Sequence, residues 1–134
     1  MRKVVLAIAL TLVIMYVIPF PIYGALSALT GLQPPIEGSV GLFMLSVLVI
    51  KCGVAVAFVL LFYLALDRWA QRWTTYALIW WVMFAVVELG QAITPDYSWL
   101  DAIGGIAAEA IYFPLAAFVV ARLLSRRTPV GESA

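Results

Sequence analysis

Hydrophobic and polar residues are arranged along this chain in long blocks, not in short alternations. A helix of about 20 apolar residues crosses a bilayer, and runs of this length are too long for barrel strands. The pattern predicts an all-α integral membrane protein, an up-down-up-down four-helix bundle with short loops. It forms one domain over residues 1–127, followed by a disordered tail at 128–134. The expected helices cover residues 4–29, 40–66, 74–93 and 101–124.

The first apolar run carries two features that change its interpretation. Arg2 and Lys3 precede it, as in a signal peptide, but the run is long for a signal core, which favours a membrane span. Pro19 and Pro21 fall inside it, and each removes a backbone donor and frees the carbonyl four residues earlier. The sequence therefore predicts a kink, either satisfied by packing or opening a polar cavity.

The charged residues near the helix ends predict the orientation. All basic residues except Lys51 fall on one side of a four-span arrangement, and Arg68 and Arg72 are flanked there by tryptophans at the expected headgroup level. The two loops of the other side carry acidic residues and no Lys or Arg: Glu37, Asp96 and Asp101. This asymmetry predicts cytoplasmic N- and C-termini in a bacterial-type inner or plasma membrane. Asp101 is the expected N-cap of the last helix.

Composition narrows the possible chemistry. Hydrophobic residues make up 66% and charged residues 11% of the 134 residues, against about 45–50% and 25% in soluble domains. Histidine is absent and Cys52 is the single cysteine, which excludes intrachain disulfides, His-ligated haem, His/Cys zinc sites and Ser-His triads. The sequence has no basic patch of the kind that binds nucleic acid, so nucleic-acid binding is not predicted. A carboxylate-only metal site has only Glu88, Glu109 and Asp101 to draw on, so neither a metal nor a cofactor is predicted.

Three charges lie inside apolar runs, at Lys51, Glu88 and Glu109. A rise of about 1.5 Å per residue places them about 16, 8 and 12 Å below the outer surface, which is a similar depth in three different helices. Each charge costs about 2.5–3.5 kcal/mol near the bilayer centre, so Lys51 is expected to pair with one glutamate. Intramembrane ionisable residues usually mark a site or pathway, although a purely architectural ion pair is the alternative.

Helical spacing adds neighbours to these charges. Trp81 and Gln91 share a stripe of the third helix with Glu88, and Tyr112 shares a stripe of the fourth with Glu109. Tyr23 can face either the cavity or the lipid interface, and the interfacial aromatic belt is the favoured assignment. The predicted ligand-binding residues are therefore Lys51, Trp81, Glu88, Gln91, Glu109 and Tyr112.

Three functions fit this constellation. One excess carboxyl suits binding or transport of a proton or of a lipophilic or cationic small molecule, with transport requiring a homodimer because one chain has few helices. The second is an intramembrane acid/base enzyme, of isomerase or cyclase type, with Glu88 and Glu109 as candidate catalytic residues on an apolar substrate. The third is a non-catalytic interaction or scaffold subunit. The predicted partners are the lipid bilayer, a lipophilic or cationic small molecule and, for transport, a second copy of the chain. Whether the chain is an enzyme is left open.

Overall fold

The described part of the structure, a computed structural model, covers residues 1–33 and 38–125, and its regular secondary structure is entirely helical. Four helical units in this part are long and apolar enough to cross a membrane, with α1 and α2 together forming the first. The predicted all-α class with four apolar spans is therefore confirmed. The expected tail at residues 128–134 lies outside the described residues. The helices are α1 (Arg2–Val17), α2 (Pro19–Thr30), α3 (Val40–Leu64), α4 (Leu66–Trp69), α5 (Trp73–Gln91) and α6 (Trp99–Leu124).

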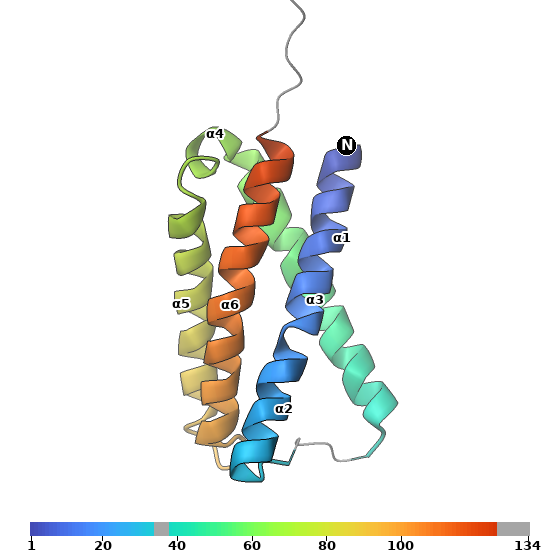
Figure 1. Cartoon of the computed structure of the whole chain (residues 1–134), viewed down its shortest axis with the longest axis vertical. Coiled ribbons are helices and arrows are strands. Elements are labelled where there is room, and N and C mark those ends of the chain that lie inside the picture. The colour runs from blue at the N-terminus through green and yellow to red at the C-terminus, as the bar shows by residue number, and fades with distance from the viewer. Residues whose placement is uncertain (34–37, 126–134) are drawn as a thin grey trace, which may run out of the picture.

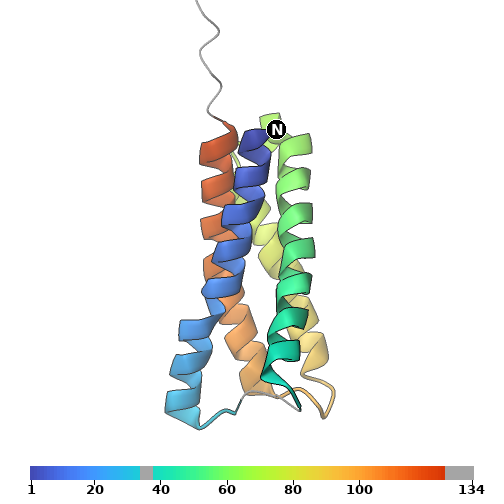
Figure 2. The ribbon, with the colours of Figure 1, turned by 90° about the vertical axis from the view of Figure 1, so that its right-hand side faces the viewer.

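The long helices run alternately up and down (Figures 1 and 2). The N-terminus, α4 and the last turn of α6 lie at one end of the bundle, here named the α4 end, whereas α2 and the α5–α6 connection reach the other, here named the loop end. Helix α6 packs closely against α5, α1 and α2, and α3 packs mainly against α1. Toward its N-terminus α3 crosses obliquely and moves away from α6 (Figure 1).

The first span is divided where its prolines begin. Helix α1 ends at Val17, and Ile18, still in right-handed helical conformation, joins it to α2. Pro19 and Pro21 occupy the first turn of α2, where a missing N–H costs little because first-turn donors have no intrahelical partner. The predicted span over residues 4–29 therefore consists of two consecutive helical segments that meet at Ile18.

The start of α6 differs from the prediction. Ser98 is the N-cap, and its hydroxyl oxygen accepts a hydrogen bond from the Asp101 backbone N–H at 3.0 Å. The same hydroxyl donates to the Asp101 carboxylate at 2.6 Å. Assignment of Asp101 as the N-cap was wrong, because the capping-box pair of Ser98 and Asp101 starts the helix two residues earlier, at Trp99.

An aromatic core fills the half of the bundle nearer the α4 end. Phe58 is fully buried at its centre, with ring centroids 4.9 Å from Tyr76, 5.3 Å from Trp80 and 5.8 Å from Phe113. The Tyr76 hydroxyl donates to the Phe58 carbonyl, so this buried polar group has a partner. We refer to Phe58, Phe62, Tyr76, Trp80 and Phe113 as the aromatic core.

Candidate functional site

Lys51 and Tyr112 join α3 to α6. The Lys51 ammonium donates a hydrogen bond to the Tyr112 hydroxyl at 2.9 Å and lies 4.6 Å from the centre of the Tyr112 ring. Within the described part of the chain, Lys51 forms no ion pair with either glutamate. The expected ion pair is therefore replaced by a bond to a neutral phenol, and neither glutamate is bound directly by the ammonium.

Glu109 lies one turn before Tyr112 on α6 and is only 3% exposed. Its Oε2 atom is buried and has no hydrogen-bond partner among the described residues. Lys51, Glu88 and Tyr112 are all close enough to interact with it electrostatically. A buried carboxyl oxygen without a hydrogen-bond partner is costly in free energy.

Glu88 lies in the last turn of α5, and its carboxylate packs directly over Gly105 of α6. A β-carbon at Gly105 would lie 2.5 Å from the Glu88 carboxyl carbon, so a glycine is required for this close approach. The Tyr97 hydroxyl donates to Glu88 Oε2 at 2.5 Å. This is the length of a charge-assisted O–H···O⁻ hydrogen bond, which fixes the Glu88 head near the loop end.

Two tyrosines belong to this site that the sequence did not assign to it. Tyr97, in the α5–α6 connection, has a pKa raised by burial and further by its hydrogen bond to Glu88. Tyr23 of α2, expected in the interfacial belt, donates to the Asp101 carbonyl at 3.1 Å and lies beside Tyr97. Its ring packs against Gly104, where a β-carbon would approach within 2.9 Å. We refer to Tyr23, Lys51, Glu88, Tyr97, Glu109 and Tyr112 as the polar cluster.

Two predicted ligand-binding residues have other contacts. The Trp81 indole N–H donates to the Ile106 carbonyl at 3.1 Å, which ties α5 to α6. Gln91 is exposed at the end of α5, where its backbone carbonyl accepts hydrogen bonds from Thr94. The structure therefore brings together four of the six predicted side chains, and Trp81 and Gln91 are not among them.

The acidic groups do not converge on a metal. Within the residues that the structure describes, no three His, Cys, Asp or Glu side chains are placed to hold an ion. The Asp101 carboxylate is instead engaged by the Ser98 hydroxyl. Glu88 and Glu109 are left as two separate carboxyls, with one amine close to both.

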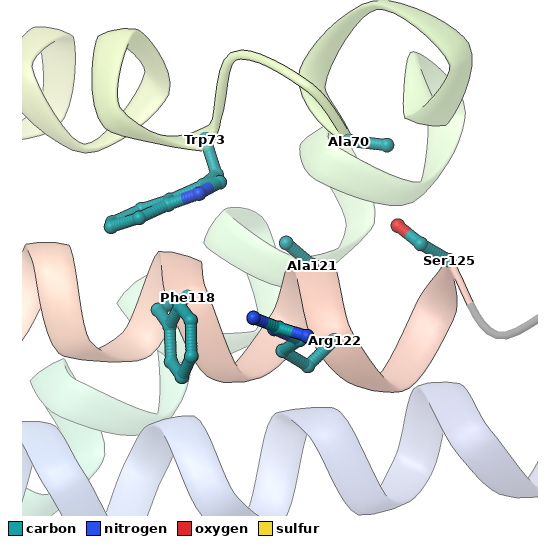
Figure 3. Close-up of a pocket in the computed structure, with 6 residues that line it drawn as sticks. All are labelled: Ala70, Trp73, Phe118, Ala121, Arg122 and Ser125. Atoms are coloured by element: carbon teal, nitrogen blue, oxygen red, sulfur yellow. The ribbon is translucent and has the colours of Figure 1, made fainter.

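Two hollows at the α4 end are distinct from the polar cluster. One of about 320 Å³ lies between the start of α5 and the last turns of α6 (Figure 3). The other, of about 350 Å³, is lined by residues 64–68, where α3 ends and α4 begins. The polar cluster lies on the other side of the aromatic core, toward the loop end.

Comparison with protein-family models, with curated proteins and with solved structures finds no match for this chain. Its function is therefore argued from the geometry of the polar cluster.

Proposed function

We propose that this chain binds a proton, or the ammonium group of a small lipophilic amine, at the polar cluster. The carboxyl of Glu109 is the binding group. The observation that supports this assignment is its buried Oε2 atom, which has no hydrogen-bond partner among the described residues. A proton or an alkylammonium N–H supplies the missing donor, and the ammonium also supplies an opposite charge in a low-dielectric site.

The charge balance of the cluster favours a single cation. Two carboxyls face one amine, and the Tyr112 hydroxyl holds that amine away from an ion pair. Glu88 Oε2 has the Tyr97 hydroxyl as a donor, whereas Glu109 Oε2 has no donor among the described residues. A scaffold subunit is expected to bury its lysine in a complete ion pair, and this arrangement therefore favours a ligand site over that alternative.

Packing around the cluster supports binding in preference to passage across the membrane. No residue of α2 is buried, and α3 has none before Ala55. An alkyl chain can therefore remain among lipids while its head reaches Glu109. The buried aromatic core occupies the bundle on the other side and closes a route to the α4 end. With the termini in the cytoplasm of a plasma or inner membrane, as the basic residues predict, the site opens toward the outer face.

Equilibrium dialysis tests this function with three probes of one chain length. The full chain in nanodiscs is dialysed against hexylamine, hexanol or hexanoate, and binding to empty nanodiscs is subtracted. We expect hexylamine alone to bind in excess, with release of about one proton into weak buffer if the carboxyl was protonated beforehand. The Glu109→Gln variant keeps the shape of the side chain and loses the charge, and it should weaken binding about tenfold or more.

The matched control is Asp96→Asn, which removes one negative charge from the exposed α5–α6 connection near the same end of the bundle. It should bind hexylamine as the parent chain does. Equal binding of hexylamine and hexanol, or equal losses in the two variants, would overturn the assignment of Glu109 as the binding group.

A further inference from the structure

The hollow between α5 and α6 at the α4 end is lined by one cation and by apolar surfaces. Its volume is about 320 Å³, at the lower limit of small-ligand pockets. Figure 3 shows the Trp73 and Phe118 rings on one side and Ser125 on the other, with the Arg122 side chain between them. The lining residues are Ala70, Trp73, Phe118, Ala121, Arg122 and Ser125.

Arg122 is placed to bind an anion from outside the chain. Its guanidinium carbon lies 5.1 Å from the centre of the Phe118 ring, so one face of the cation is covered by an aromatic ring. Stacking of this kind leaves the N–H groups at the edge of the guanidinium plane available for hydrogen bonds. Among the described residues that line the hollow none is acidic.

The chemistry of the hollow matches a phosphate attached to an apolar group. A planar guanidinium binds phosphate oxygens through two parallel N–H bonds, and the Ser125 hydroxyl offers a further donor at the rim. The Trp73 and Phe118 rings, whose centroids are 5.5 Å apart, form an apolar wall beside this position. Arg68, Arg72 and the tryptophans of the α4–α5 region place the same end of the bundle at the expected level of lipid headgroups.

We propose that this hollow is a binding site for the phosphate of an anionic phospholipid, held by the Arg122 guanidinium against the Trp73–Phe118 wall. Free phosphate shares the anionic chemistry, but it does not use the apolar wall. The site is separate from the polar cluster and does not depend on what binds there. Its role is to fix one anionic lipid at the α4 end of the bundle, between α5 and α6.

Native mass spectrometry of the full chain in detergent tests the site with three probes. These are dihexanoyl-phosphatidylglycerol, dihexanoyl-phosphatidylcholine and inorganic phosphate, each added alone. We expect the anionic lipid to be retained more strongly than the zwitterionic one. The Arg122→Gln variant should lose about tenfold in affinity for the anionic lipid, the size expected for a charge-assisted hydrogen bond.

Arg72→Gln is the matched control, because it removes the same charge from an exposed neighbour of Trp73 that does not line the hollow. It should retain the lipid, and Arg122→Lys should fall between the parent and Arg122→Gln because lysine lacks the planar fork. If inorganic phosphate binds the parent chain and not Arg122→Gln, the result supports the anion site and shows that free phosphate is a second ligand for it. Equal losses in Arg72→Gln and Arg122→Gln at unchanged melting temperature, or no preference for the anionic lipid, would overturn the proposal.

Discussion

The two halves of this bundle use the same helix, α6, in opposite ways. Toward the α4 end, Phe113 and the small and β-branched residues that follow it pack against the aromatic core, in which the Tyr76 hydroxyl has a backbone partner. Toward the loop end, Gly104 and Gly105 admit the head of Tyr23 and the carboxylate of Glu88. The first half is tightly packed, whereas the second holds charges with incomplete partners.

The comparison shows that one half of this small protein provides stability and that the other half carries the ionisable groups. Lipid tails are as apolar as core side chains, so close packing and not hydrophobic transfer must hold the helices together, and the aromatic core provides that packing. Once α6 is held there, the loop-end half can keep an unpartnered carboxyl without unfolding the bundle. The predictions below test this separation, from the largest expected effect to the smallest.

Phe58→Ala should produce the largest loss of stability. Phe58 is fully buried and contacts three other rings, so truncation leaves a cavity at the centre of the aromatic core. We expect a loss of about 2–3 kcal/mol, mainly from the cavity because transfer from lipid gives little. Unfolding in mixed detergent micelles measures it, with Leu60→Ala on the exposed face of α3 as the control. A similar loss in both variants would show that the aromatic core does not hold the bundle.

Lys51→Met should increase the affinity for hexylamine, on the order of tenfold, because it removes a positive charge close to Glu109. The direction distinguishes this effect from damage to the fold, which lowers affinity. Dialysis of the full chain in nanodiscs measures it. Unchanged or weaker binding in a variant that melts like the parent would mean that the ammonium does not act on the ligand.

Gly105→Ala should lower the free energy of unfolding by about 1 kcal/mol or more, because it overpacks the loop-end half. A β-carbon there would lie 2.5 Å from the Glu88 carboxyl carbon, so the carboxylate must move away and lose the Tyr97 hydroxyl. Gly90→Ala is the control, because a β-carbon at Gly90 has nothing within 4 Å and alanine favours the helix by about 0.5–1 kcal/mol. Thermal unfolding should therefore separate the two variants in opposite directions, and equal behaviour contradicts the packing of Glu88 on Gly105.

Tyr97→Phe should have the smallest effect, and it should be pH-dependent. The folded pKa of Tyr97 is raised, so the folded state keeps a proton that the unfolded state loses above about pH 10. The associated stability is present below that pH and falls as the pH rises above it. Tyr97→Phe removes this contribution, so its stability should decline less between neutral and strongly alkaline pH. Parallel curves for the parent and the variant would show that Tyr97 is not buried against Glu88.

Hydropathy was sufficient for the four spans, but not for the details at their ends. The apolar runs predicted every long helix to within a few residues, because length and apolarity decide what crosses a membrane. The division of the first span at Ile18 and the cap at Ser98 depend on local backbone and side-chain groups. The spacing of Ser98 and Asp101 is that of a capping box, which would have indicated Ser98 as the N-cap. Asp101 was assigned as the N-cap instead because its carboxylate is charged.

Sequence analysis could identify only those residues of the site whose charge lies inside an apolar run. Lys51, Glu88 and Glu109 stand out because charges in apolar runs are rare. Tyr23 and Tyr97 carry no such signal, since a tyrosine near a helix end is ordinary and its direction depends on how the helices are rotated. The same rotation directs Trp81 to the Ile106 carbonyl, although Trp81 shares a helical stripe with Glu88.

Zero-length coupling tests the central claim most directly. A lipophilic carbodiimide activates buried carboxyls, and an amine in contact with the activated carboxyl displaces the urea and leaves an amide. The full chain in nanodiscs is treated with carbodiimide and hexylamine, and the amide is located by peptide mapping. We predict the hexyl amide on Glu109. An amide on Asp96 or Glu88 with Glu109 unmodified would contradict the account.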